Sequence, residues 1–237
     1  MPFGYFGAKH GLARFYSPPL HDVVIEPFCG SAAYSVYWAK KGKVKHAILR
    51  DTNVKIVELW RRLKFMSEKD LDSIPDPVKG ERTVEPLIAA ASAEQGMAVL
   101  SGRSRQVTER MVKSWPNLKS RIREALPFIR DWDVEHASYD ACPDIEATWF
   151  IDPPYGFRIG EDGKQRAGGV RYHEWFPQDP IDYKVLAAWS MSRKGQVIVC
   201  EQHPASWLPF VEFRRQTNNV GAGTRSIRTE VVFEKGA

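Results

Sequence analysis

The sequence has few cysteines and no long hydrophobic run. Its 237 residues include three cysteines, Cys29, Cys142 and Cys200, whose wide spacing matches neither a disulfide framework nor a zinc site. We therefore expect ordinary buried thiols, no metal and a reducing, cytoplasmic setting. No apolar stretch approaches the roughly 18 residues of a membrane span, and the first residues lack a signal-peptide pattern, so we expect no membrane partner.

The net charge of +5 is concentrated in one part of the chain. Residues 101–130 contain eight basic side chains and two acidic ones, so the remaining residues are nearly balanced in charge. Such a segment is typical either of a solvated helix face or of a surface that binds a polyanion. The hydrophobic content of 43% excludes a disordered chain and is sufficient for one substantial core.

Two short apolar runs predict neighbouring parallel strands. Val23-Val24-Ile25 ends at Glu26, and Ala47-Ile48-Leu49 ends at Asp51. Each run is followed by helical spacing, and Asn53 is a predicted N-cap of the second helix. This β-α-β-α order predicts an α/β fold, with a doubly wound, mostly parallel, Rossmann-like sheet.

The alternation of strands and helices stops after the second helix. Between about Ser67 and Arg130 we expect Pro-containing turns and helices without a strand. Beyond it we expect strands at 132–136, 148–151 and 197–200, a helix at 182–193, and a closing antiparallel hairpin at 210–213 and 230–233. The predicted units are a doubly wound domain, residues 1–64 and 131–237, and a mostly helical insertion, residues 65–130.

Small residues follow the first predicted strand, in Glu26-Pro27-Phe28-Cys29-Gly30-Ser31-Ala32-Ala33. Small side chains at the carboxyl end of a parallel strand let a ligand approach the backbone, close to the amides of a helix N-terminus. Such a turn is also common without any ligand. Asp51 at the end of the next strand favours a nucleotide-like ligand, because an acid there accepts hydrogen bonds from ribose hydroxyls.

The segment Thr148-Trp149-Phe150-Ile151-Asp152-Pro153-Pro154-Tyr155 is the most informative in the chain. An apolar strand is followed directly by an acid, two prolines and an aromatic residue. Because the prolines fix their own φ angles, the loop should be stiff and should hold Asp152 and the Pro153 carbonyl as adjacent acceptors. An ordinary strand-ending turn is the alternative, since Asp-Pro often begins turns.

Taken in order, these motifs resemble the Dam-type adenine-specific DNA methyltransferases. The resemblance rests on Phe3 to Lys9, Glu26-Pro27-Phe28-Cys29-Gly30, Asp51 and Asp152-Pro153-Pro154-Tyr155. It implies transfer of a methyl group from S-adenosylmethionine to the N6 amine of a flipped adenine, with S-adenosylhomocysteine as product and no metal. It also implies a bacterial or phage-infected cell and double-stranded DNA as partner, with any restriction endonuclease on a separate chain. For an enzyme of this size, a monomer is our default expectation.

The resemblance assigns roles to residues of this sequence. Asp152, Pro153, Pro154 and Tyr155 are the predicted catalytic residues, with Asp152 positioning the amine and Tyr155 stacking on the base. The predicted cofactor-binding residues are Tyr5, Lys9, Glu26, Phe28, Cys29, Gly30, Ser31, Asp51, Thr52, Ser138, Tyr139 and Asp152. Two positions depart from the family pattern: Ala32 replaces a second glycine, and Ser138 stands where an acid before an aromatic residue is common, with Asp140 as a possible substitute.

The order of the motifs assigns DNA recognition to the insertion, which is also where the basic excess lies. We expect the Gly-rich segment from Gly156 to Tyr172 to be a mobile loop over DNA or a plain surface loop, and 224–228 to be a basic hairpin loop. The predicted DNA contacts are Arg103, Arg105, Lys113, Lys119, Arg121, Arg123, Arg158, Lys164, Arg166, Arg171, Arg225 and Arg228.

Two other functions are compatible with these residues. One is methylation of RNA, which the order of the motifs disfavours. The other is non-catalytic nucleic-acid binding on a methyltransferase fold, which the intact Asp152-Pro153-Pro154-Tyr155 disfavours and Ser138 leaves open. Cytosine methylation is less consistent with Asp152, because serine is usual at that position in the relatives that methylate cytosine.

Overall fold

The computed structural model describes part of the chain in detail. Its backbone is described for residues 2–4, 9, 11–90, 99, 103–159, 165–167, 181–219 and 225–236. Within these ranges, side chains are not described for 157–159, 165–167, 216–219 and 225–228.

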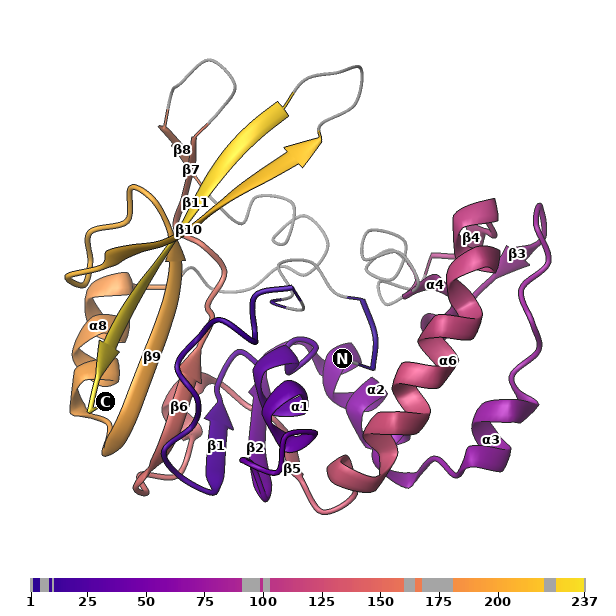
Figure 1. Ribbon diagram of the computed structural model, residues 1–237, viewed down its shortest axis with the longest axis horizontal. Coiled ribbons are helices and arrows are strands. Elements are labelled where there is room, and N and C mark those ends of the chain that lie inside the picture. Colours follow the sequence, from indigo (N-terminus) through magenta and orange to yellow (C-terminus); the bar gives the residue numbers. More distant parts are fainter. Residues whose placement is uncertain are drawn as a thin grey trace.

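Seven strands form one mixed, mostly parallel sheet (Figure 1). In spatial order they are β10 (Val211–Asn219), β11 (Arg225–Lys235), β9 (Gly195–Gln202), β6 (Ala147–Ile151), β1 (Val23–Glu26), β2 (His46–Asp51) and β5 (Asp133–His136). The strands from β9 to β5 are parallel, whereas β11 is antiparallel to both β9 and β10. The predicted α/β class, parallel sheet and closing antiparallel hairpin are confirmed.

The order of the strands reverses between β1 and β6. The chain proceeds from β1 outward through β2 and β5, and later builds β6 and β9 on the other side of β1. In open α/β sheets, ligands bind at such a reversal, outside the carboxyl ends of the strands. The loops that leave β1 and β6 there contain Gly30 and Asp152, so the fold brings the two main sequence motifs to one edge of the sheet.

Helices cover both faces of the sheet because neighbouring strand residues point to opposite sides. On one face, Val24 and Phe150 pack in a cluster that includes residues of α1 (Ala33–Ala39), α2 (Val54–Phe65) and α6 (Glu109–Ile129). On the other face, Ile25 and Trp149 pack with Trp189 of α8 (Tyr183–Ser192). All three cysteines are free and buried, as expected.

Helix α6 is built into the same core as the sheet. Its buried Leu118, Ile122 and Ile129 recur at helical spacing and belong to the cluster that contains the strand residues. The helix continues through Pro116 and Pro127, although each proline removes a backbone donor. The prolines therefore do not break this segment into the expected turns, because burial of one continuous face holds the helix together.

The rest of the segment before β5 contains short elements. They are α3 (Glu68–Ser73), β3 (Arg82–Thr83), α4 (Pro86–Ala89) and β4 (Arg105–Gln106). The expectation of no strand here is wrong, because β3 and β4 form a small antiparallel pair. Figure 1 shows α3 and α6 at the opposite end of the molecule from α8. Among the described residues, no helix is both long and apolar enough to cross a membrane.

Two expected loops contain strands instead. Within the Gly-rich segment, β7 (Phe157–Ile159) pairs with β8 (Gln165–Ala167), and Arg225 to Arg228 form the start of β11, paired with the end of β10. Both predictions took polar and glycine-rich composition as the sign of a loop, but ladder hydrogen bonds join backbones and tolerate such side chains. The β7–β8 hairpin lies beyond the carboxyl ends of the parallel strands, and so does the part of the β10–β11 hairpin before Glu230, where the pairing of β11 with β9 begins (Figure 1).

Candidate active site

The loop after β1 contains two residues with left-handed backbone. Gly30 has a φ angle of 44° and Ala32 a φ angle of 42°. Glycine adopts this conformation freely, whereas another residue incurs a cost of about 1–2 kcal/mol. Ala32 is the position where the resemblance suggests a second glycine, and its backbone gives the physical reason for that preference. The Cys29 N–H donates to the Arg50 carbonyl at 2.9 Å, which ties this loop to β2.

Asp51 at the end of β2 holds the loop after β1 by a hydrogen bond. One carboxylate oxygen accepts from the Gly30 N–H and the other from the Asn53 N–H, both at 2.9 Å. Burial raises the pKa of Asp51 to about 6, although these hydrogen bonds oppose the rise. The Cys29 thiol is a second, weak donor to the oxygen that Gly30 contacts, at 3.9 Å, so the other oxygen, Oδ1, is the one with a lone pair left for a ligand.

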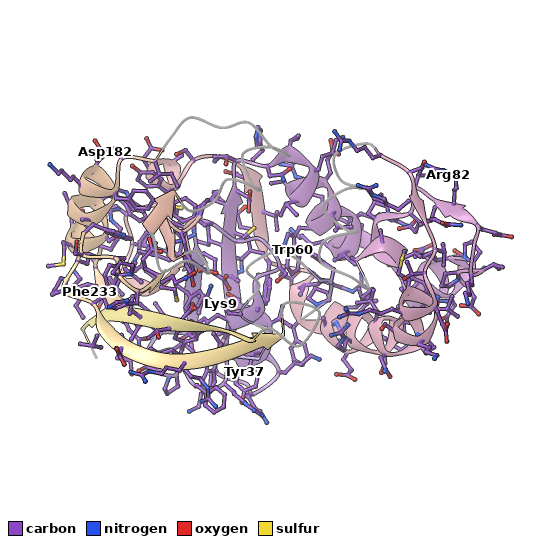
Figure 2. The ribbon with its side chains drawn as sticks, turned by 90° about the horizontal axis from the view of Figure 1, so that it is seen from above. Lys9, Tyr37, Trp60, Arg82, Asp182 and Phe233 are labelled. Carbon is purple, nitrogen blue, oxygen red and sulfur yellow. The ribbon has the colours of Figure 1, made fainter. Side chains whose placement is uncertain are left out.

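Trp60 of α2 supports the same loop and is labelled in Figure 2. Its indole Nε1 donates to the Gly30 carbonyl at 2.8 Å, and its ring packs edge-on against Phe3, with centroids 5.4 Å apart. Trp60 is fully buried. Asp51 and Trp60 therefore hold the left-handed conformation of Gly30, one through its N–H and the other through its carbonyl.

Glu26 ends β1 and is buried beneath the start of α1. Its Oε1 accepts from the Ser35 N–H at 2.9 Å and from the Ser35 hydroxyl at 2.6 Å. Burial raises the pKa of Glu26 to about 8, and the two hydrogen bonds from Ser35 only partly oppose this. At neutral pH the folded protein therefore holds this carboxyl group mostly protonated.

The Glu26→Gln variant is expected to melt higher than the wild type at about pH 8, by roughly 5 °C, and to match it near pH 4. The pKa is about 8 in the folded protein and about 4.3 in an unfolded chain, so wild-type stability falls as the pH rises between these values. Glutamine keeps an oxygen acceptor for Ser35 and removes the charge. Thermal unfolding at the two pH values measures the effect, and a lower melting temperature of the variant at pH 8 would contradict it.

The loop after β6 meets Lys9 and the closing hairpin. The Lys9 Nζ donates to Asp152 Oδ1 at 2.6 Å and lies 3.3 Å from Glu230 Oε1. The Tyr155 hydroxyl donates to the same Glu230 oxygen, and Lys9 lies 4.7 Å from the centroid of the Tyr155 ring. Figure 2 shows Lys9 beside the β10–β11 hairpin. We refer to Lys9, Asp152, Tyr155 and Glu230 as the acid–lysine cluster.

Burial and charge set the protonation of this cluster. Burial lowers the pKa of Lys9, but the charges of Asp152 and Glu230 outweigh it and leave the pKa above its ordinary value. Burial raises the pKa of Asp152 to about 6, and the positive charge of Lys9 limits the rise. Burial raises the pKa of Tyr155 well above its ordinary value. At neutral pH, Asp152 is thus mainly an ionised hydrogen-bond acceptor, and Tyr155 is neutral.

Residues of α8 and β9 hold the end of the loop after β6. The Tyr183 hydroxyl donates to the Pro154 carbonyl, and the Gly156 N–H donates to Glu201 at 3.2 Å. Glu201 also accepts from the Trp207 indole at 3.1 Å, and burial raises its pKa to about 7. These bonds hold the backbone on both sides of Tyr155.

Sequence reasoning missed Glu230, Tyr16 and Glu201. The Tyr16 hydroxyl lies 3.3 Å from Glu230, and its ring stacks on Phe213 with centroids 4.5 Å apart. All three missed residues are buried. The available signal was an acid within or beside an apolar strand, as in Glu230-Val231-Val232-Phe233, because a charged side chain is rarely buried without a partner.

Aromatic rings lie near the predicted cofactor end of the site. Phe28 and Tyr139 are both partly exposed, with centroids 5.6 Å apart, and Tyr139 packs against Trp189 at 5.0 Å. Tyr139 begins a short 3-10 helix after β5. Ser138 and Asp140 on either side of it are exposed, so neither the serine nor its possible substitute is fixed by burial.

The other predicted cofactor residues are spread along the same edge. Cys29 is buried with its sulfur 3.9 Å from an Asp51 oxygen, and Ser31 is also buried. Thr52 is exposed, and its carbonyl lies 2.9 Å from a ring nitrogen of His136. Tyr5 lies outside the described residues.

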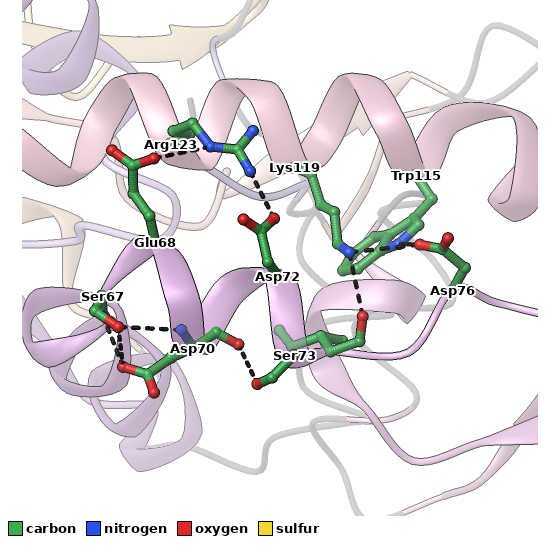
Figure 3. Close-up of polar contacts among 10 residues, drawn as sticks. Ser67, Glu68, Asp70, Asp72, Ser73, Asp76, Trp115, Lys119 and Arg123 are labelled. Atoms are coloured by element: carbon green, nitrogen blue, oxygen red, sulfur yellow. Dashed lines mark hydrogen bonds and ion pairs between the residues drawn. The ribbon is translucent and has the colours of Figure 1, made fainter.

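Three predicted DNA contacts of α6 take part in ion pairs within the protein. Lys119 lies 3.4 Å from Asp76 and donates to the Ile74 carbonyl at 3.2 Å, and Arg123 pairs with Asp72 at 2.6 Å (Figure 3). Lys113 pairs with Glu109 at 2.6 Å, one turn earlier on its own helix. The basic excess of this segment is therefore partly balanced by acids nearby in space. Exposed pairs of this kind are weak, at about 0.2–1 kcal/mol, so a phosphate could still replace the acids.

The remaining predicted DNA contacts have varied environments. Arg103 is exposed, Arg105 is half-buried on β4, and Arg121 is half-buried with a pKa that burial lowers. Lys164 and Arg171 lie outside the described residues. The side chains of Arg158, Arg166, Arg225 and Arg228 are likewise not described, although their backbones belong to the two hairpins above the sheet edge.

Comparison with known proteins found no matching family model and no matching curated protein. In the described ranges, no group of three or more His, Cys, Asp or Glu side chains has an arrangement that could hold a metal ion. Function must therefore be argued from the fold and from the chemistry of the site.

Proposed function

We propose that this protein is a site-specific DNA methyltransferase that transfers a methyl group from S-adenosylmethionine to the N6 amine of a flipped adenine. The observation that carries the proposal is the position of Asp152-Pro153-Pro154-Tyr155. This loop leaves β6 at the reversal of strand order, opposite the small-residue loop after β1, where α/β sheets bind ligands. The order and chemistry of the motifs, which resemble the Dam-type enzymes, support the same function.

The loop after β1 and the end of β2 fit the cofactor. The left-handed backbone at Gly30 lets a ligand approach closely, and Asp51 Oδ1 has a lone pair for a ribose hydroxyl. Phe28 and Tyr139 offer partly exposed rings for a base. When bound, S-adenosylmethionine would supply an electrophilic methyl group on its sulfonium. Neither a metal nor a covalent intermediate is needed for such a transfer.

The acid–lysine cluster and the Pro153 carbonyl fit the adenine amine. Its nitrogen is a poor nucleophile because its lone pair is delocalised into the ring. Asp152 and the Pro153 carbonyl would accept the two amine hydrogens, which favours a pyramidal nitrogen with its lone pair free. Lys9 favours the ionised, accepting form of Asp152. Tyr155, held by Glu230, would stack on the base, which must leave the duplex to reach this site.

Recognition of the target would involve the segment before β5 and the two hairpins above the sheet edge. Within the segment 65–130, residues 101–130 carry the basic excess of the chain. The β7–β8 hairpin and the outer part of the β10–β11 hairpin lie beyond the carboxyl ends of the parallel strands (Figure 1). We propose double-stranded DNA as the partner and a monomer as the active species.

Incubation with radiolabelled S-adenosylmethionine and mixed genomic DNA tests the proposed function. Label is expected in N6-methyladenine after digestion of the DNA to nucleosides. Parallel reactions with RNA control for substrate class, and cytosine derivatives from the same digest control for the base. Label found only in RNA or in cytosine would give the protein another substrate, and DNA binding without any transfer would support the non-catalytic alternative.

A further inference from the structure

Two arginines far apart in the sequence meet on one exposed aromatic ring. The guanidinium carbon of Arg214 lies 3.7 Å from the centroid of the Phe15 ring, and that of Arg14 lies 4.6 Å from it. Both arginines are exposed, and the Phe15 side chain is 39% exposed. We refer to these three residues as the Arg–Phe platform. The predicted DNA contacts do not include any of them.

The platform adjoins the proposed catalytic site on two chain segments. Tyr16, the residue after Phe15, reaches Glu230 of the acid–lysine cluster with its hydroxyl and stacks on Phe213, the residue before Arg214. Arg214 is also the cross-strand partner of Glu230 in the β10–β11 ladder. Directly opposed residues of antiparallel strands share a face of the sheet, so Arg214 and Glu230 lie on the same side of the hairpin.

The two positive charges of the platform are not balanced within the described part of the chain. There, no carboxylate lies within ion-pair distance of either guanidinium, whereas Lys119 and Arg123 each pair with an acid. Glu230, the acid opposite Arg214, already accepts from Tyr155 and contacts Lys9. Both guanidiniums lie close to one ring centroid, so their separation is within the screening length of about 10 Å in 0.1 M salt. An anion bound near both guanidiniums would offset their repulsion.

We propose that the Arg–Phe platform binds the DNA backbone beside the flipped adenine. Each guanidinium presents a planar set of N–H donors that fits phosphate oxygens, and stacking on Phe15 limits its motion before binding. Phosphate contacts position a duplex without reading its sequence. The platform would thus act together with the predicted recognition segment. This inference deepens the proposed function and rests on it for the identity of the polyanion.

The test measures binding of a short fluorescent duplex by the Arg14→Gln, Arg214→Gln and double variants over a range of salt concentrations. Each lost phosphate contact is expected to reduce the slope of log association constant against log salt by about 1, and the double variant to reduce it by about 2. The weakening should be similar for duplexes of unrelated sequence. Because the arginines are exposed, the melting temperatures of the variants should match the wild type.

Arg215→Gln is the matched control, because Arg215 is the next residue of β10 and pairs with Glu212 at 3.4 Å. Its slope should equal that of the wild type. The platform proposal would be overturned by an unchanged slope in the double variant or by an equal loss of slope in the Arg215→Gln control. It would also be overturned if the wild type preferred RNA or did not bind the duplex. Label transfer to adenine with unchanged slopes would leave the proposed function standing. Reduced slopes without any transfer would leave the platform standing and overturn the proposed function.

Discussion

The Asp152→Ala variant is expected to transfer methyl groups about 10²–10³-fold more slowly than the wild type, with little change in DNA binding. The loss of one preorganised hydrogen-bonding group in a buried site commonly lowers kcat by about 10²–10³, and Asp152 also bears the charge that opposes Lys9. Single-turnover transfer of label to adenine measures the rate. The proposed role of Asp152 would be wrong if the variant kept more than about a tenth of wild-type activity.

Asp152→Asn separates charge from shape in the same experiment. Asparagine keeps an oxygen that can accept from Lys9. Its NH₂ group would then face the adenine amine, and NH₂ cannot accept a hydrogen bond from that amine. We therefore expect a loss close to that of the alanine variant. Asp22→Ala is the matched control, since Asp22 forms an exposed ion pair with Lys45 at 2.6 Å and precedes β1, at the opposite end of that strand from the proposed site. It should leave the transfer rate unchanged, and melting temperatures would show whether either Asp152 variant unfolds.

The same residue predicts an acid limb in the pH profile. Burial raises the pKa of Asp152 to about 6, and only the ionised form accepts hydrogen bonds through both oxygens. Activity should therefore fall about tenfold per pH unit below pH 6. Lys9→Met removes the charge that holds this pKa down, so it should move the limb to higher pH. A profile that stays flat down to about pH 5 would contradict this account.

The parallel part of the fold could be predicted because its strands are buried on both faces. Val23-Val24-Ile25 and Thr148-Trp149-Phe150-Ile151 are continuous apolar runs, and such runs occur where helices cover both sides of a sheet. The pairs β3–β4 and β7–β8 could not be predicted in this way, because their two or three residues each show no clear alternation. Helix α6 was harder for the opposite reason, since two prolines suggested breaks that its buried face overrides.

Apart from Lys9, which the family resemblance indicated, the candidate site was predictable only where its residues follow a strand in the chain. Gly30, Asp51 and Asp152 each lie just past a predicted strand, and the fold brings such ends to one edge. Glu230 reaches Tyr155 only because β11 pairs with β9 in one particular register, with Glu230 opposite Gln202. The register of this strand pair cannot be predicted from the composition of the strands. The ion pairs of Lys119 and Arg123 could not be predicted either, because their partners lie more than 40 residues away in the chain.

Trp60 gives the largest expected effect on stability. The Trp60→Ala variant should lose about 3–5 kcal/mol of unfolding free energy and melt about 10 °C lower or more, because it empties a fully buried indole site between Phe3 and Trp132. Chemical denaturation measures the loss. A cost below about 1 kcal/mol would mean that the ring is not packed in the core.

Trp60→Phe isolates the hydrogen bond to the Gly30 carbonyl. Phenylalanine keeps most of the buried apolar surface but leaves that carbonyl without its indole donor, at a cost of about 1–3 kcal/mol. Trp132→Phe is the matched control, since the Trp132 ring lies 6.0 Å from Trp60 and its Nε1 has no hydrogen-bond partner among the described residues. It should cost clearly less. Because Trp60 donates to the loop after β1 and Trp132 does not, Trp60→Phe alone of these two variants should also raise the KM for S-adenosylmethionine. Equal KM values in the two variants would contradict a role of the Gly30 conformation in cofactor binding.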